Sequence, residues 1–535
     1  MDVLIVGAGP TGLSLAVNLL QAGIRVRLVD AEPERSHHSR ALAVQARTLE
    51  LFEKIGIAEP LVAQGTRAFR ISAFAKGQQL FHLEIPDIGV DDSPFPFILF
   101  VSQYETERAL ERKLLELGGQ VERPTRLLEF REQADHVIAT LERDGAREEL
   151  RTSYIVGCDG AHSTVRKSLG LEFAGATYPQ TFLLGDVDVE WSLPKDQLNV
   201  FLGDDGVLAA FPLRGNQIRA IVATSEFEHD RDPTLEELQT LARRYSQTAL
   251  TFKNPEWLAS YRIHHRGVER YRVGRAFLAG DAAHIHSPAG GQGMNTGIQD
   301  AWNLGWKLAL VLRGEARDAL LDSYERERLP VGRMLLRVTD RLFGAVTTRN
   351  PVVIAARNAL APRLAPWFFG NAQRRRRAFR FVSELGIKYR ESPIVGEPAG
   401  PHDAAFERGA AAGDRAPDAP LQLPDGARSH LFEVISGPAH HLLVFVPPGH
   451  TVPTEQTTSL TQRLGLDTRV HVVAFHPDGP VFVDTDGLVR QRYGIRSEGL
   501  VLIRPDGHIA YRTEGLDFDA LVAHVAQAYR SGAAS

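Results

Sequence analysis

The first thirty residues carry the pattern that most constrains the fold of this chain. A short apolar run, Val3 to Val6, leads directly into Gly7-Ala8-Gly9-Pro10-Thr11-Gly12. A helical pattern follows that ends near Gly23, and a second apolar run ends at Asp30. Continuous apolar runs of this length are typical of buried parallel strands. The segment therefore predicts a strand–helix–strand unit within an α/β sheet.

The glycine spacing in this unit predicts a dinucleotide site. One glycine permits the tight turn, the next lets the backbone approach a pyrophosphate, and the third allows the helix to pack closely on the strand. The helix N-terminus attracts the phosphate charge, and the carboxylate that ends the second strand can accept hydrogen bonds from a ribose. The candidate cofactor-binding residues are Gly7, Gly9, Thr11, Gly12 and Asp30. The loop alone does not distinguish FAD from NAD, although its place at the start of the chain favours FAD.

Length, charge and cysteine content exclude several classes of protein. At 535 residues the chain is too long for one compact core, so we expect two to four domains. A net charge of -5 gives no reason to expect a nucleic acid or an anionic membrane as partner, and the basic run Arg374 to Arg377 is interpreted as a solvated helix face. Cys158 is the only cysteine, which excludes intramolecular disulfides and a cysteine-ligated metal site within one chain. Without a membrane-length apolar run or a signal-peptide pattern, we expect a soluble, cytoplasmic protein.

Two later segments also join a strand to a glycine-rich turn. Tyr154 to Arg166 reads as a strand, an Asp159-Gly160 turn and a helix start. Gly274 to His284 reads as a strand that ends in Gly280-Asp281. It is followed by the sequence Pro-Ala-Gly-Gly-Gln-Gly-Met-Asn at 288–295 and by a long amphipathic helix.

In order, spacing and wording, these three segments resemble the fingerprints of the single-component (class A) flavoprotein aromatic hydroxylases, the p-hydroxybenzoate hydroxylase-like family. The resemblance covers about residues 1 to 395 and includes Tyr324 to Pro330 at the close of a later helix. It implies tightly bound FAD, reduction by NADPH or NADH that binds transiently, and hydroxylation of an aromatic or phenolic substrate by O2 through a flavin C4a-hydroperoxide. The presence of a single dinucleotide fingerprint argues against a separate nicotinamide-binding Rossmann domain.

The third segment contributes most of the candidate flavin contacts. The resemblance implies that Asp281 accepts a hydrogen bond from a ribityl hydroxyl of FAD, and that main-chain groups around Pro288 help to orient the reactive oxygen. The segment from Gly290 to Asn295 opens a helix, so its backbone N–H groups can stabilise negative charge on the reduced ring. Candidate flavin-binding residues here are Gly291, Gly293, Met294 and Asn295, and candidate catalytic residues are Pro288, Gly291 and Arg40.

Two further positions, Arg40 and Gln103, are matched individually, and simpler alternatives are stated for Arg40, Leu127 and Asp159. Arg40, in Ser39-Arg40-Ala41, resembles a family contact to FAD phosphate or flavin, although a surface salt bridge is the alternative. Gln103 resembles the glutamine that contacts the FAD ribose region, and Leu127 is a candidate for the adenine pocket or else a core residue. Asp159 is assigned an indirect or nicotinamide-related role together with Arg166, with a plain turn as the alternative.

The middle of the chain predicts a β-sheet that would bind substrate. Strands are expected at Thr181–Val189, Asn199–Leu202, Gly206–Pro212 and Gln217–Thr224, separated by turn signals. Candidates to line an apolar pocket above the flavin are Phe182, Leu184, Phe201 and Phe211, each with core packing as the alternative.

We therefore expect an α/β protein in which a Rossmann-like (GR2-type) FAD-binding domain carries an inserted substrate-binding sheet. The expected parts are 1–179 and 273–395 for the FAD-binding domain and its helices, 180–272 for the inserted sheet, 396–418 for a linker and 419–535 for a C-terminal domain. The last resembles the thioredoxin-like domain of the larger family members but lacks redox cysteines, so subunit contact in a homodimer or structural support is expected.

Several alternatives stay open at this point. A Baeyer–Villiger or epoxidising monooxygenase of the same family would use the same motifs, and a flavin-linked reductase or dehydrogenase would use them without inserting oxygen. A non-catalytic FAD-binding assembly protein is a third alternative. The sequence identifies neither a proton-transfer base nor the substrate, which could be a simple phenol, a polyketide or an antibiotic. His264, His284 and His286 are interpreted as structural.

Overall fold

A computed structural model gives the fold of the chain. It describes residues 1–530 except 37–40, 86–87, 195, 204–205, 228–230, 287–290, 348–351, 355, 357–359, 361–362, 365–366, 368–369, 401, 451 and 477–480. Two of the predicted site residues, Arg40 and Pro288, therefore lie outside the described residues.

A six-stranded sheet forms the centre of the N-terminal part, in the order β18-β19-β12-β1-β2-β8. Its strands are β1 (Val3–Val6), β2 (Val26–Val29), β8 (Val121–Glu122), β12 (Tyr154–Gly157), β18 (Arg272–Val273) and β19 (Ala276–Leu278). All neighbours are parallel except β18 and β19. The apolar run at the N-terminus thus became a fully buried central strand, as its composition predicts.

Helices cover this sheet and a small antiparallel sheet packs beside it. Helix α1 (Pro10–Gln21) contacts both α4 (Gln103–Glu116) and α7 (Gly293–Leu312). Strands β9 (Arg126–Glu132), β10 (Val137–Arg143) and β11 (Ala146–Thr152) form the small sheet, which contacts α5 (Thr164–Ser168). The predicted α/β architecture with a parallel sheet is confirmed.

A second large sheet has eight strands, in the order β20-β17-β13-β16-β15-β14-β5-β6. Its strands are β5 (Arg70–Ala75), β6 (Gln78–Glu84), β13 (Ala174–Trp191), β14 (Leu198–Leu202), β15 (Val207–Pro212), β16 (Gln217–Thr224), β17 (Leu250–Gly267) and β20 (His284–Ile285). The strands predicted between residues 181 and 224 fall within β13 to β16. The sheet also takes β5 and β6 from the first part of the chain, which local sequence patterns did not indicate.

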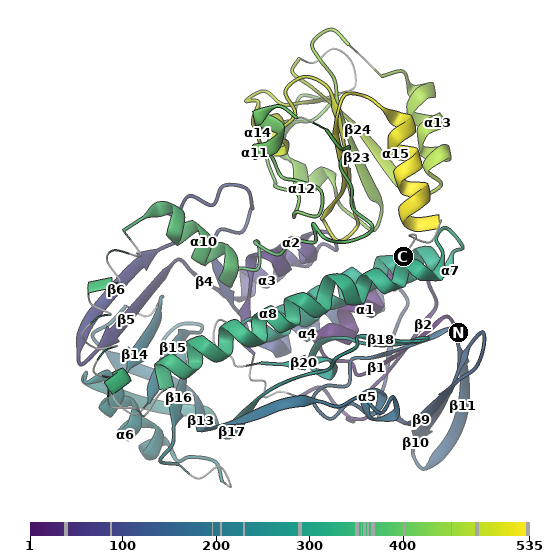
Figure 1. Cartoon of the computed structure of the whole chain (residues 1–535). Helices are drawn as coiled ribbons and strands as arrows, with labels where there is room; N and C mark the ends of the chain where they lie inside the picture. Colours follow the sequence, from purple (N-terminus) through teal and green to yellow (C-terminus); the bar gives the residue numbers. More distant parts are fainter. Residues whose placement is uncertain are drawn as a thin grey trace.

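Helix α6 (Leu235–Ser246) covers one face of the eight-stranded sheet and contacts its four strands β13 to β16. The remaining elements of this region are β3 (Ala43–Val44), β4 (Thr66–Ala68), β7 (Ile98–Phe100), α2 (Ala46–Glu53), α3 (Ala58–Gln64), η2 (Gly280–Ala282), η3 (Asp318–Leu321), α8 (Asp322–Thr347) and α10 (Ala372–Val382). Helix α8 runs the length of the molecule across both sheet systems (Figure 1).

The C-terminal part has its own seven-stranded sheet, in the order β22-β21-β25-β24-β23-β26-β27. Its elements are α11 (Ala404–Arg408), β21 (Pro420–Gln422), β22 (Arg428–His430), α12 (Leu431–Val434), β23 (His440–Phe445), α13 (Thr454–Leu464), β24 (Thr468–Ala474), β25 (Phe482–Val483), α14 (Leu488–Tyr493), β26 (Gly499–Ile503), β27 (Ile509–Glu514), α15 (Phe518–Val525) and η4 (Ala526–Arg530). One apolar core lies on each face of the sheet.

The segment expected to be a bare linker is instead part of this C-terminal unit. Phe406, Ala412 and Ala416 are buried in its core, and Arg415 forms an ion pair with Glu50 of α2. Small alanines and glycines allow the strand-free chain to pack tightly here, which is why its composition resembles that of a linker.

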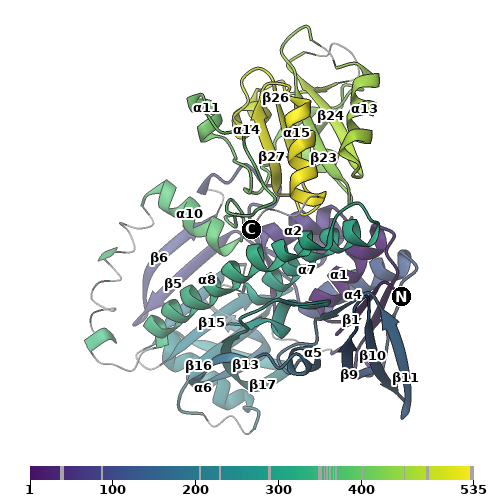
Figure 2. The same ribbon diagram turned by 45° about the vertical axis from the view of Figure 1, so that its right-hand side comes forward.

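The C-terminal unit stands on helices α2 and α7 of the N-terminal part (Figures 1 and 2). The turn between β26 and β27 enters this contact, where Arg504 donates to Glu327 of α8 at 2.7 Å. Glu327 also pairs with Lys307 of α7 at 2.8 Å, and all three side chains are fully buried. The two parts are thus joined by a buried network of charges rather than by a tether.

Among the residues that the structure describes, no helix combines the length and the apolar character needed to cross a membrane.

Candidate functional site

The first loop has the geometry of a phosphate-binding turn. Gly7 has φ +100°, and a Cβ there would lie 2.4 Å from the carbonyl oxygen of Cys158. A Cβ on Gly12 would lie 1.9 Å from the oxygen of Gly7, so both positions require glycine because the backbone is too close. At Gly9 a Cβ would meet nothing within 4 Å. The loop is therefore closely packed at Gly7 and Gly12 and open at Gly9, beside the point where α1 begins without a capping side chain.

Asp30 lies directly beside this loop at the end of β2. Its Oδ2 accepts a hydrogen bond from the Ala8 N–H at 2.6 Å, and Arg123 lies 3.5 Å from its Oδ1. The carboxylate therefore fixes the loop and stays partly exposed.

Gln103, at the start of α4, belongs to the same neighbourhood. It donates from Nε2 to Glu107 at 2.7 Å. Burial raises the pKa of Glu107 to about 7, against the opposing effects of Gln103, Arg35 and Arg123. Glu107, Arg35 and Arg123 were not predicted, since they are single charged residues outside any motif.

The second motif is held together by its own side chains. Asp159 accepts hydrogen bonds from Ser163 Oγ at 2.5 Å and from the Thr164 N–H at 2.6 Å, so it caps α5. Arg166 donates to the carbonyl of Ala282 at 3.1 Å, which ties this motif to the third one. These contacts account for both residues structurally, and the nicotinamide role that the resemblance implies stays a prediction.

The third motif meets the first loop at Thr11. Cβ atoms on Gly280 and Gly297 would lie 2.5 and 2.4 Å from Thr11 Oγ1, so α1, the turn at 280 and α7 converge there. Next to this point, Asp281 is exposed, yet burial of its carboxyl raises its pKa, with His284 opposing the rise. Asp281 therefore combines surface exposure with surroundings that disfavour its charge.

A buried acid that sequence reasoning missed holds this turn in place. Asp300 on α7 accepts from the Gly280 N–H at 3.0 Å, from His284 Nε2 at 2.7 Å and from Arg328 Nε at 2.6 Å. Although burial acts to raise it, Arg328 and His284 hold the pKa of Asp300 below its usual value. His284 is therefore structural, as predicted, and the i,i+4 helix pattern around Asp300 gave no signal of its role.

The start of α7 is fastened to β3 by one side chain. Asn295 accepts from the Gln45 N–H at 2.9 Å and donates to the carbonyls of Ala43 at 2.9 Å and Gly291 at 2.8 Å. Both N–H groups of its amide are used, and its Oδ1 accepts one hydrogen bond. Gly291 has φ +62°, a conformation that favours glycine, and Gly293 and Met294 form the first turn of the helix.

The residues present fit FAD. The open face of Gly9 and the uncapped N-terminus of α1 suit a pyrophosphate. The accessible carboxyl of Asp281 suits a polyol, and the uncapped N-terminus of α7 suits an electron-rich ring. Leu127, in contrast, is 2% exposed in the core and pairs with Leu141 on β10, which supports the core alternative for this residue.

The eight-stranded sheet offers one open apolar face. On the face away from α6 several apolar side chains are only partly buried, and they lie on four adjacent strands, β16, β15, β14 and β5. They include Ile71, Val200, Leu202, Val207, Ala209, Phe211 and Ile221. Phe182 and Leu184 lie on this same side of the sheet but are buried in an apolar cluster on β13, where the ring of Phe182 stacks 5.6 Å from Tyr261; this supports the core alternative for both.

Phe201 is on the opposite face, and this corrects its prediction as a substrate contact. It is fully buried against α6 and stacks on Phe74 with ring centroids 4.9 Å apart. Val200, the preceding residue, pairs with Ala209 on the open face. Because successive side chains of a strand point to opposite faces, the ring of Phe201 points into the core.

Fold and site together define an FAD-dependent α/β enzyme with a second, eight-stranded sheet. The description "FAD binding domain" is that of a family model that matches residues 1–339, and the chain belongs to this family of flavin-dependent monooxygenases.

Similar proteins bear this out over nearly the whole chain. The 6-methylpretetramide 4-monooxygenase of Streptomyces rimosus is 35% identical over 95% of this chain and 90% of its own length. The pentachlorophenol 4-monooxygenase of Sphingobium chlorophenolicum is 32% identical over 96% and 94%. The structure of the anhydrotetracycline hydroxylase from Streptomyces rimosus covers 100% of this chain and 99% of its own, with 30% identity and a TM-score of 0.77. The predictions of FAD as cofactor and of a monooxygenase are confirmed.

Proposed function

We propose that this enzyme uses NAD(P)H and O2 to hydroxylate a phenolic ring within a compound of several fused rings. The observation that carries the proposal is the open apolar face of the eight-stranded sheet. It spans four adjacent strands, and at about 4.8 Å between strands it is about 14 Å wide. A single phenol ring would leave most of this face in contact with water. Relatives whose names specify tetracycline precursors are consistent with a fused-ring substrate.

When bound, FAD supplies the redox chemistry that activates O2 with electrons from NAD(P)H. The side chains and backbone of the protein bind the cofactor, orient the substrate and shield both from water. Asp281 is placed to hold the ribityl chain, and the N-terminus of α7 stabilises negative charge near Gly291 to Met294. The apolar side chains of β14 and β15 exclude water and orient the aromatic ring. A contact from Arg40 and an orienting role for Pro288 stay predictions.

A panel of substrates tests the proposal. Flavin reduction by NADPH and by NADH is followed without O2 in the presence of single-ring phenols and of tricyclic and tetracyclic phenols. We expect a fused-ring phenol to accelerate reduction, and O2 carrying an oxygen isotope to add one labelled oxygen to the ring. Equal turnover without O2, giving a product without added oxygen, would instead support the reductase alternative. A labelled ester or epoxide would support the Baeyer–Villiger or epoxidising alternative.

Three further predictions accompany this function and concern the protein as a whole. They are a cytoplasmic location, assembly as a homodimer and the division into FAD-binding, substrate-binding and C-terminal domains, without a separate linker. A fourth prediction is that the C-terminal unit, with its seven-stranded sheet, is similar to thioredoxin.

A further inference from the structure

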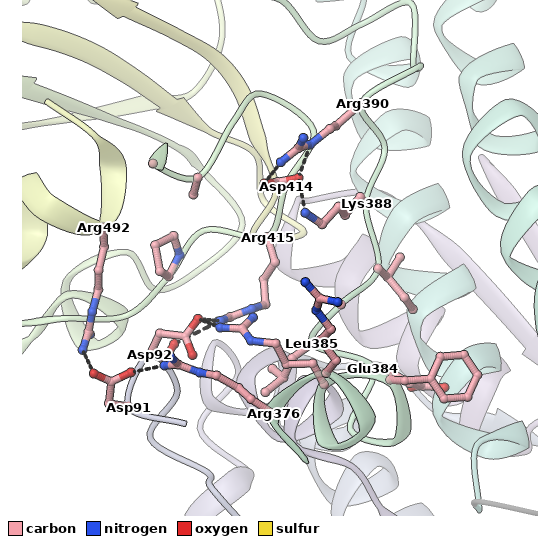
Figure 3. Close-up of a pocket in the computed structure, with 18 of the residues that line it drawn as sticks. Asp91, Asp92, Arg376, Glu384, Leu385, Lys388, Arg390, Asp414, Arg415 and Arg492 are labelled. Atoms are coloured by element: carbon pink, nitrogen blue, oxygen red, sulfur yellow. Dashed lines mark hydrogen bonds and ion pairs between the residues drawn. The ribbon is translucent and has the colours of Figure 1, made fainter. Parts of the chain in front are cut away.

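A basic cleft of about 810 Å³ lies between the N-terminal part and the C-terminal unit (Figure 3). Its wall is formed by α10, by the segment that follows α10, by residues of α8 and by α14. Gln292 and Thr296, in the first turn of α7, line its inner end. The cleft therefore reaches the helix whose N-terminus follows the predicted flavin loop.

Eight basic side chains and five carboxyl groups line this cleft, in a protein whose net charge is -5. Three of the carboxylates each lie between two cations (Figure 3). Asp91 pairs with Arg376 and Arg492, Asp92 with Arg380 and Arg415, and Asp414 with Lys388 and Arg390. Glu50 also pairs with Arg415, so the Asp92 group is balanced, but Asp91 and Asp414 each neutralise only one of their two cations and the cluster keeps an excess of positive charge.

Glu384 does not offset this excess. It lies buried at the inner end, where it accepts a hydrogen bond from Thr296 Oγ1 at 2.8 Å. Burial raises its pKa to about 8, so it is mostly protonated near neutral pH. The remaining carboxyl group, Glu407, is exposed.

Two observations identify donors that are available to an anion. Arg415 is 5% exposed, and its Nε–H has no hydrogen-bond acceptor although the guanidinium lines the cleft. Arg377 and Arg408 are exposed at the cleft, and neither forms an ion pair with any residue that the structure describes. Arginine is the side chain best suited to phosphate because its planar fork donates two parallel hydrogen bonds.

We propose that this cleft binds the phosphate groups of NAD(P)H and directs the nicotinamide towards the first turn of α7. The inference rests on the proposed function, because it assigns a site to the reductant of that reaction. The one dinucleotide loop of the described chain is used for FAD, so the second nucleotide needs a different phosphate site. Cleft volumes of about 300–1,000 Å³ are usual for small-molecule ligands. A concave basic surface on an acidic protein also concentrates anions.

The experiment compares FAD-loaded wild type with the double variant Arg377→Gln/Arg408→Gln. Calorimetry measures the binding of ADP and of 2′,5′-ADP, which carry the phosphates without the nicotinamide. Rapid mixing measures flavin reduction against the concentrations of NADPH and NADH. We expect the dissociation constant for NADPH and that for 2′,5′-ADP each to rise about tenfold in the double variant. This is the effect expected when one or two charged hydrogen bonds are lost. The limiting rate of reduction stays unchanged, since neither side chain contacts the flavin region.

A matched control removes the same charge elsewhere. Arg143→Gln/Arg147→Gln changes two exposed arginines at the turn between β10 and β11, with side chains 55% and 69% exposed. This variant should bind both probes as wild type does. A selective loss of 2′,5′-ADP would assign the arginines to the 2′-phosphate, and an equal loss of ADP would assign them to the diphosphate; either result supports the site.

Unchanged affinities in the Arg377→Gln/Arg408→Gln variant, or an equal loss in the control, would overturn the proposal. Such a result leaves the proposed function intact if wild type still oxidises NAD(P)H and hydroxylates a fused-ring phenol. If wild type fails to do so while the probes still bind the cleft, the proposed function is wrong and the phosphate site stands.

Discussion

Two glycines of the first loop serve different purposes, although they stand three residues apart in one motif. Gly12 has no room for a Cβ because the backbone oxygen of Gly7 would lie 1.9 Å away. Gly9 has ordinary backbone angles of φ -72° and ψ -176° and free space beside it. Gly12 is thus required by folding, and Gly9 is required by the ligand.

Alanine at each position separates these purposes. Gly9→Ala should change the free energy of unfolding of the FAD-free protein by less than about 0.5 kcal/mol, yet weaken FAD binding about tenfold or more. Gly12→Ala should destabilise the protein by about 3 kcal/mol or more, because the backbone must move. Thermal unfolding and FAD titration of the FAD-free protein measure both. Tight FAD binding by Gly9→Ala would show that the phosphate does not approach this glycine.

Glu384 predicts a pH dependence at the residue scale. Its pKa in the folded protein is about 8, above the usual value of 4.5, so the folded state holds the proton more tightly than the unfolded state. Its contribution to stability is therefore full below about pH 4.5 and is lost as the pH rises through 8.

Glu384→Gln should remove that loss. Relative to wild type, its free energy of unfolding should increase between pH 5 and pH 8.5 by an amount on the order of a few kcal/mol. Denaturant unfolding at a series of pH values gives the difference. A constant difference across this range would mean that Glu384 is ionised in the folded protein.

At the scale of elements, strand alternation decides which aromatic residues can reach a substrate. Phe201 and Phe211 both lie in predicted strands, but the first packs under α6 and the second is half-buried on the open face, with its ring 5.5 Å from Phe100. Phe201→Ala should cost about 3–5 kcal/mol of stability and leave substrate affinity largely unchanged. Phe211→Ala should cost about 1–2 kcal/mol and raise the substrate dissociation constant. Unfolding and substrate titration distinguish the two; similar substrate effects would contradict the assignment of faces.

The same comparison shows how far sequence reasoning extends. Period-two alternation and turn signals were sufficient to place β13 to β16, and the three glycine motifs placed the FAD loops. They could not tell which face of the sheet is closed by α6, since α6 follows the strands and its docking depends on tertiary contacts. They also could not join β5 to β14, because that pairing links residues more than 120 positions apart.

For the molecule as a whole, the contact between its two parts rests on a buried cluster of charges. Arg504 pairs with Glu327 and with Asp506, and Lys307 completes the cluster. Burial alone would lower the pKa of Arg504, but the two carboxylates raise it well above its usual value. Removing one member leaves the others buried without compensation.

Arg504→Met should therefore destabilise the protein by about 3–5 kcal/mol. Arg463→Gln serves as the control, since Arg463 and its partner Asp519 lie in the same unit with side chains 45% and 85% exposed. Its effect should stay within about 1 kcal/mol. Thermal unfolding followed by both flavin release and secondary structure measures the change. If Arg504→Met unfolds like wild type, the cluster does not couple the two parts.

The position of that cluster in the chain also bears on how the protein is made. Glu327 lies 177 residues before Arg504, so during synthesis its carboxylate is made long before this partner. Until then, the Glu327–Lys307 pair lacks its second cation, and Lys307 lies on α7, the helix whose first turn follows the predicted flavin loop. A nascent chain halted before Gly499 should therefore stay sensitive to protease and fail to retain FAD. Acquisition of the cofactor would then follow the synthesis of the turn between β26 and β27.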